Sequence, residues 1–193
     1  IEEDDGEKTI NTSMNSDEYD QAIPPSIGNL SQFDSEIPFT LLSLYNNDLE
    51  GDIPAEIGEL TNLKSLRLQN NDLEGEIPAE LLDLNNLVKL NIENNNLEMN
   101  VEDEDSNPID TKAESLQWLF AGRNNIERIS EDFKAPSIRF LHLEENELEE
   151  LPEDFGKLDS GKGDLDGFLE QNQLLTHLDL GSNKLTTFPG DEN

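Results

Sequence analysis

The chain has 193 residues, with 12 basic against 45 acidic side chains, a net charge of −33 and no cysteine. This charge repels phosphate backbones, which excludes nucleic acid as an expected partner, and the lack of thiols excludes a disulfide framework and a cysteine-type zinc site. No apolar run approaches the roughly 18 residues of a membrane-spanning helix, so we expect no membrane insertion.

The N-terminal segment, residues 1–22, is acidic and lies outside the repeats that follow. It predicts either a cap or a disordered segment. Only 33% of all residues are hydrophobic. A chain so charged is expected to stay disordered unless a repeat concentrates its apolar residues.

A repeat of this kind runs between residues 23 and 189. The pattern L-x-x-L-x-L-x-x-N-x-L is clearest at Leu63, Leu66, Leu68, Asn71 and Leu73. There are six copies, and their first positions are Phe39, Leu63, Leu87, Leu116, Ile138 and Leu175. Each copy predicts a short strand with inward leucines, and the units must stack because one unit cannot bury its leucines alone. This is the signature of a leucine-rich repeat.

Two early copies continue with the pattern G-x-I-P, at residues 51–60 and 75–84, and residues 23–30 hold the tail of an earlier one. This continuation resembles the plant-type subclass of leucine-rich repeat proteins, which includes ectodomains of receptor-like kinases and polygalacturonase-inhibiting proteins, although the chain lacks their capping cysteines. The resemblance implies an α/β solenoid, a right-handed superhelix with a concave parallel β-sheet and convex turns and short 3₁₀ or helical segments. It also implies an extracellular or lumenal location, with the cytoplasm as the alternative.

We expect a repeat domain of about six to seven repeats over residues 23–189 and a tail at residues 190–193. Asn71 and its equivalents should satisfy backbone groups at the bend, while Ile77 and Leu81 close the coil from the convex side. The tail is too short to cover the apolar edge of the last repeat, so further repeats or another subunit are expected to cover it.

Two acidic insertions interrupt the array, near residues 100–111 and 159–170. The spacing of Asp103, Asp105 and Glu114 imitates a calcium loop, but Pro108 stands where such a loop needs glycine for its sharp turn. A solvated cluster of charge is the favoured interpretation, and calcium binding stays open as the alternative.

The exposed strand positions of the six copies form the predicted concave face, thirty residues in all. They carry a net charge of +1, whereas the other 163 residues carry a net charge of −34. Neighbouring strands disfavour like charges, which explains part of this neutrality. The gathering of basic side chains in so acidic a chain favours a binding face.

Aromatic residues gather on the same face, with Trp118 and Phe140 at the third position of adjacent strands. Such pairs stabilise a sheet, but Trp, Tyr and Arg are also the residue types that dominate binding at interfaces. Two histidines on separate strands do not make a metal site without a third ligand, so no metal site is predicted. The candidate partner-binding residues are Tyr45, Arg67, Lys89, Trp118, Phe120, Arg123, Arg139, Phe140, His142 and His177.

The repeats hold no G-x-S-x-G, no H-E-x-x-H and no G-x-G-x-x-G motif. We therefore predict that the chain is not an enzyme and needs no cofactor. The predicted function is a recognition module that binds a protein or peptide through its concave face. The alternative is a structural or adhesion protein of an extracellular matrix or wall, or an accessory subunit of a larger assembly.

Overall fold

The computed structural model describes residues 2–4, 7–11, 21–33, 38–99, 113–129, 135–152 and 174–187. Both acidic insertions, Asp103 and Asp105 of the calcium-like spacing, and the tail at residues 190–193 lie outside the described residues, whereas Glu114 is described and exposed. The elements in chain order are β1 (Glu2–Asp4), β2 (Glu7–Asn11), η1 (Pro25–Phe33, a 3₁₀ helix), β3 (Phe39–Ser43), β4 (Glu50–Asp52), η2 (Ala55–Glu59, also 3₁₀), β5 (Ser65–Arg67), β6 (Asp72–Glu76), α1 (Ala79–Leu82), β7 (Lys89–Asn91), β8 (Asn96–Glu98), β9 (Trp118–Phe120), β10 (Phe140–His142) and β11 (His177–Asp179).

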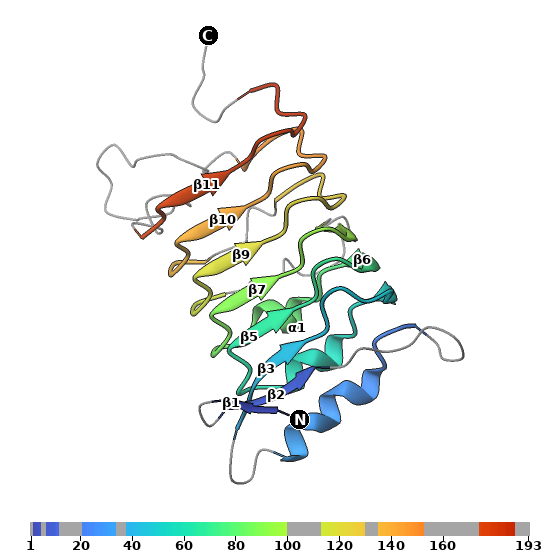
Figure 1. Ribbon diagram of the computed structural model, residues 1–193. Helices are drawn as coiled ribbons and strands as arrows, with labels where there is room; N and C mark the ends of the chain where they lie inside the picture. Colours follow the sequence, from blue (N-terminus) through green and yellow to red (C-terminus); the bar gives the residue numbers. More distant parts are fainter. Residues whose placement is uncertain are drawn as a thin grey trace, which may run out of the picture.

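The strands of the repeats form one sheet, in the order β1-β2-β3-β5-β7-β9-β10-β11. Pairing is parallel from β2 onward, and the pair of β1 and β2 is antiparallel. Figure 1 shows the repeat strands stacked side by side along one face of the molecule. The register sets the leucines of the fourth repeat position opposite one another, since Leu90 pairs with both Leu66 and Leu119. The predicted solenoid with a parallel sheet is confirmed.

The acidic N-terminal segment adds β1 and β2 to the edge of the sheet, beside β3. The sequence predicted either a cap or a disordered segment over residues 1–22, and the choice between the two stays a prediction. Next to β2, Thr40 and Ser43 of β3 are buried, with 4% exposure each, although the repeat pattern assigned both to the exposed face. Of the face positions within β3, only Leu41 keeps partial exposure.

A second parallel sheet, β4-β6-β8, forms where the G-x-I-P continuation occurs. Gly51 and Gly75 in this sheet have a φ of 72°, a conformation that side chains rarely adopt, so glycine is required. Pro54 and Pro78 then start η2 and α1 from an extended backbone. These short helices make the convex side of the early repeats, as the sequence predicted.

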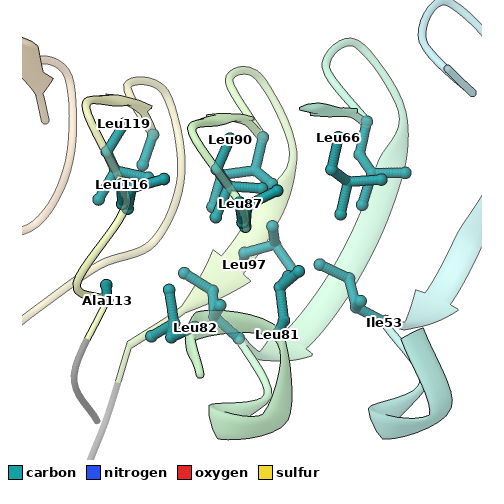
Figure 2. Packing of buried hydrophobic residues seen from close by; sticks show 14 of the residues in the cluster. Ile53, Leu66, Leu81, Leu82, Leu87, Leu90, Leu97, Ala113, Leu116 and Leu119 are labelled. Atoms are coloured by element: carbon teal, nitrogen blue, oxygen red, sulfur yellow. The ribbon is translucent and has the colours of Figure 1, made fainter. Parts of the chain in front are cut away.

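The core lies between the large sheet and the convex elements. Leu66, Leu90 and Leu119 point inward from the sheet, with exposures of 0 to 2%. Figure 2 shows Leu81 and Ile53 on the opposite, convex side of this core. Ile77, also convex, is 9% exposed, so the predicted closing of the coil by Ile77 and Leu81 is confirmed. Burial of these side chains is the main favourable term for a fold of this kind.

A ladder of asparagine amides joins successive repeats. The Nδ2 of Asn95 donates to the carbonyls of Ile92 at 3.0 Å and Leu68 at 3.1 Å, and its Oδ1 accepts from the Leu73 amide at 3.1 Å. The Leu68 carbonyl also accepts from Asn71 at 2.7 Å, so both of its lone pairs are used. The ladder consists of the buried Asn71, Asn95, Asn124 and Asn146 and the half-buried Asn183. The predicted role of these asparagines at the bend is confirmed.

The last repeat is less covered than the others. Leu178 of β11 is 38% exposed, whereas its neighbour Leu141 in β10 is 1% exposed. Leu180 and Leu185 are partly buried. That another surface covers this edge stays a prediction.

Among the described residues, every helix is too short or too polar to cross a bilayer.

Candidate ligand-binding face

Three rings stack across the third repeat positions of β9, β10 and β11. The centroids of Trp118 and Phe140 lie 6.2 Å apart with an interplanar angle of 22°, and those of Phe140 and His177 lie 4.4 Å apart at 13°. Register causes this stack, because Phe140 pairs with both other residues and parallel strands lie about 4.8 Å apart. We call Trp118, Phe140 and His177 the aromatic row. His177 is exposed and the other two are half-buried, so each ring keeps some surface for a ligand.

A second set of contacts lies beside the aromatic row. The Nζ of Lys89 lies 5.3 Å from the ring centroid of Phe120, a cation–π distance, and the rings of Phe120 and His142 lie 5.0 Å apart at 60°. Phe120 and His142 follow Trp118 and Phe140 by two residues, so they project from the same face of the sheet. The result is one continuous surface of rings with a lysine at its edge.

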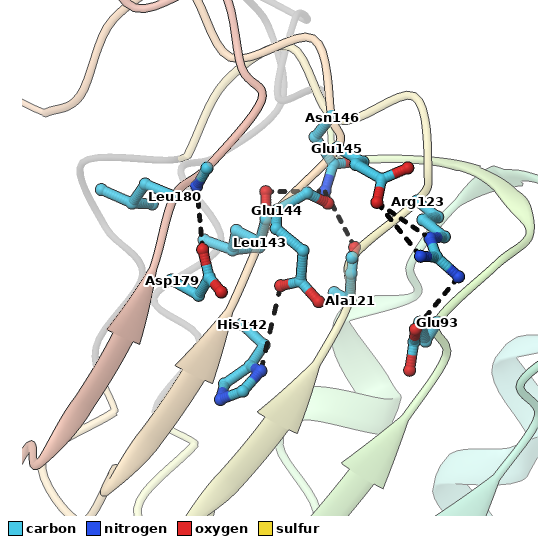
Figure 3. A network of polar contacts seen from close by, with 12 residues as sticks. Glu93, Ala121, Arg123, His142, Leu143, Glu144, Glu145, Asn146, Asp179 and Leu180 are labelled. Atoms are coloured by element: carbon cyan, nitrogen blue, oxygen red, sulfur yellow. Dashed lines mark hydrogen bonds and ion pairs between the residues drawn. The ribbon is translucent and has the colours of Figure 1, made fainter.

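Arg123 is held by neighbouring carboxylates rather than by the rings. Its Nε and Nη2 both donate to Oε1 of Glu145 at 3.1 Å, and its Nη1 lies 4.0 Å from Oε1 of Glu93 (Figure 3). The hydrogen bond and the charge of Glu145 raise the pKa of Arg123 above its ordinary value. The guanidinium is fully charged at neutral pH, with Glu145 compensating it locally.

The repeat assignment is decided by comparison with known proteins. The family model described as Leucine Rich Repeat matches residues 62–84 and 137–158. The fold is a leucine-rich repeat solenoid. No curated protein sequence matches the chain.

Solved structures of leucine-rich repeat proteins match over most of the chain. The plant peptide hormone receptor RGFR1 in complex with RGF2 is 27% identical with a TM-score of 0.62, over 85% of this chain and 23% of the receptor. The ectodomain of the Arabidopsis thaliana receptor kinase GASSHO1/SCHENGEN3, in complex with CASPARIAN STRIP INTEGRITY FACTOR 2, is 27% identical with a TM-score of 0.60, over 85% and 17%. A leucine-rich repeat protein of Leptospira interrogans is 27% identical with a TM-score of 0.64, over 87% and 36%. The chain thus spans about a third or less of each of these proteins.

The leucine-rich repeat solenoid brings most of the predicted binding residues together. The six that lie in one cluster on β7 to β11 are Lys89, Trp118, Phe120, Phe140, His142 and His177. Arg139 is exposed directly before Phe140, at the rim of this cluster. Arg67 lies in β5, directly beside β7, where it pairs with Asn91, and Tyr45 follows β3, one strand further from the cluster.

Two carboxylates next to His142 were missed as site residues from the sequence. Glu144 and Asp179 belong to the thirty positions of the predicted face and contribute to its net charge, but neither was predicted to bind a ligand. The repeat register held the signal, because Asp179 occupies the same repeat position as His142 one strand further on, and Glu144 follows His142 by two residues. Both therefore share the face of the His142 ring.

A surface hollow of about 350 Å³ lies off the large sheet, between the repeats that carry η2 and α1. Its lining includes Gly58, Glu80 and Asn86. None of the ten residues predicted for binding lines it. The candidate face is instead the open surface of the sheet, a shape suited to an extended ligand.

Proposed function

We propose that this leucine-rich repeat solenoid is a non-catalytic recognition module that binds a peptide in an extended conformation across β7 to β11. The observation that carries the proposal is the aromatic row beside Phe120, in a chain of net charge −33 whose predicted concave face is nearly neutral. Half-buried rings lose little conformational freedom on binding, and Trp is the residue type most enriched among binding hot spots.

The charges near the aromatic row favour a ligand that is apolar at its centre. Lys89 and Arg139 flank the rings, while Arg123 is compensated by Glu145. An apolar or aromatic side chain of the peptide would stack on the row, and a carboxylate or backbone carbonyl would meet Lys89 or Arg139. The strongly acidic remainder of the chain would steer peptides of net positive charge toward the protein.

The solved neighbours support a peptide as the ligand. Two of them are receptors whose structures are complexes, RGFR1 with RGF2 and GASSHO1/SCHENGEN3 with CASPARIAN STRIP INTEGRITY FACTOR 2. The second is described as the ectodomain of a plant membrane receptor kinase. By analogy we place this chain in an extracellular or lumenal compartment.

The test is selection from a displayed random-peptide library on the immobilised chain, followed by affinity measurements on the enriched peptides. Replacing Trp118 and Arg139 together by alanine should weaken a selected peptide by more than about 2 kcal/mol, or about thirtyfold in Kd. The melting temperature should change little, since neither side chain lies in the core.

Two control variants separate a specific contact from loss of charge. Arg128→Ala removes the same charge from an exposed residue outside the sheet and should leave the affinity unchanged. Trp118→Phe keeps a ring in the row and should retain part of the affinity. Equal binding by the wild-type chain and the double variant would reject this face as the recognition surface.

A further inference from the structure

Three metal-ligating side chains converge beside the aromatic row. His142 lies in β10, Glu144 follows it on the same face, and Asp179 lies opposite His142 in β11. One ligand atom from each of the three lies within 4.8 Å of the others. Figure 3 shows the carboxylates of Glu144 and Asp179 directed toward the space above His142. The side chains of His142 and Glu144 are 29% and 25% exposed, so the cluster is partly shielded from water.

One oxygen of the Glu144 carboxylate is buried without a hydrogen-bond partner among the described residues, although the side chain as a whole is 25% exposed. This buried oxygen is Oε2. The Nδ1 of His142 lies 3.9 Å away, too far for a hydrogen bond. Arg123 directs its hydrogen bonds to Glu145 instead and acts on Glu144 only through longer-range charge. A buried carboxylate oxygen without a partner is costly, and a bound cation would remove that cost.

The neighbouring repeats hold this arrangement in place. Gly122 occupies the position of Glu144 in the preceding repeat, and a Cβ there would lie 2.7 Å from the carboxyl carbon of Glu144. Glycine therefore provides the space that the carboxylate fills. On the other side, the amide of Gly181 donates to Oδ1 of Asp179 at 2.9 Å, which orients that carboxylate as outer contacts orient metal ligands.

We propose that His142, Glu144 and Asp179 bind one divalent transition-metal ion of the zinc type. An imidazole nitrogen favours zinc over calcium or magnesium as the bound ion. Zinc also accepts carboxylate oxygens as ligands beside histidine nitrogens. Ligand atoms at about 2.1 Å from a tetrahedral ion lie about 3.4 Å from one another. The three ligand atoms here lie within 4.8 Å of one another, so small side-chain rotations bring them to this distance. Three protein ligands leave a fourth position for water or for a group of a bound molecule. This site goes beyond peptide recognition and does not depend on it.

The chain has only two histidines, which allows a direct readout by NMR of the imidazole nitrogens. We expect one equivalent of Zn²⁺, added in physiological salt with excess Mg²⁺, to shift the resonances of His142 and leave those of His177 in place. His177 is the matched internal control because it lies on the same face but stacks on Phe140. The excess Mg²⁺ occupies carboxylates that bind divalent ions only through the overall negative charge.

Calorimetric titration with Zn²⁺ tests the individual ligands. His142→Gln, Glu144→Gln and Asp179→Asn should each lower the affinity by at least about tenfold, whereas His177→Gln and the exposed carboxylate variant Glu80→Gln should not. Gly122→Ala, which fills the space beside the Glu144 carboxylate, should also weaken binding while His142 remains. Equal responses of both histidines, or equal affinities of His142→Gln and His177→Gln, would overturn the proposal.

Discussion

Replacing Asn95 by alanine is expected to lower the free energy of unfolding by about 3 kcal/mol. The substitution leaves the buried Leu73 amide without an acceptor and removes the hydrogen bonds to the carbonyls of Ile92 and Leu68. An orphaned buried donor costs about 1–3 kcal/mol, and each lost hydrogen bond costs about 1 kcal/mol more. The two carbonyls keep a second donor from neighbouring ladder asparagines, which limits the loss.

The measurement for Asn95→Ala is chemical unfolding followed by circular dichroism. Asn86→Ala is the matched control, because Asn86 is exposed and donates to a single carbonyl, that of Thr61, at 2.9 Å. Its cost should stay below about 1 kcal/mol. If Asn95→Ala and Asn86→Ala have the same midpoint of chemical unfolding, the asparagine ladder does not hold the repeats together.

Replacing Leu90 by alanine should cost about 3–4 kcal/mol, within the range for buried leucines. Leu90 is fully buried, and its neighbours Leu66 and Leu119 in the sheet are buried with it, so the cavity has little room to collapse. Trp118→Ala removes a larger side chain but should cost less than about 1.5 kcal/mol, the range of an aromatic pair. The reason is that the ring lies on the solvent-facing side of the large sheet, away from the core.

The comparison of these two variants by thermal and chemical unfolding tests the strand register. A shift of one residue would exchange the two faces of the sheet. A Trp118→Ala variant destabilised as strongly as Leu90→Ala would therefore show that Trp118 lies in the core.

The sequence was sufficient to predict the large sheet, the inward leucines and the role of Asn71 and its equivalents, because each repeats with the same spacing. It did not predict the second sheet, β4-β6-β8, since strands of three to five residues, two of them containing a glycine, are too short to show the alternation that identifies a strand. Nor did it predict the burial of Thr40 and Ser43, because the pattern treats every repeat alike.

The candidate face could also be predicted in part, because its residues occupy equivalent positions of successive repeats. Trp118 and Phe140 share a repeat position, so their stacking follows from register alone. His142 and Asp179 share the fifth position of adjacent repeats, so their pairing also follows from register, but on this face only the two histidines were considered as metal ligands. Side-chain direction was the missing information for Glu144, whose carboxylate turns into the space left by Gly122.

Trp118 is the sole tryptophan of the chain, so its fluorescence reports directly on recognition at the aromatic row. A library-selected peptide should be titrated into the wild-type chain while the emission of Trp118 and its quenching by acrylamide are recorded. We predict a saturable change in emission and a loss of acrylamide quenching, both with the Kd found independently by calorimetry. Saturable peptide binding that leaves the emission and the quenching of Trp118 unchanged would contradict recognition through this face.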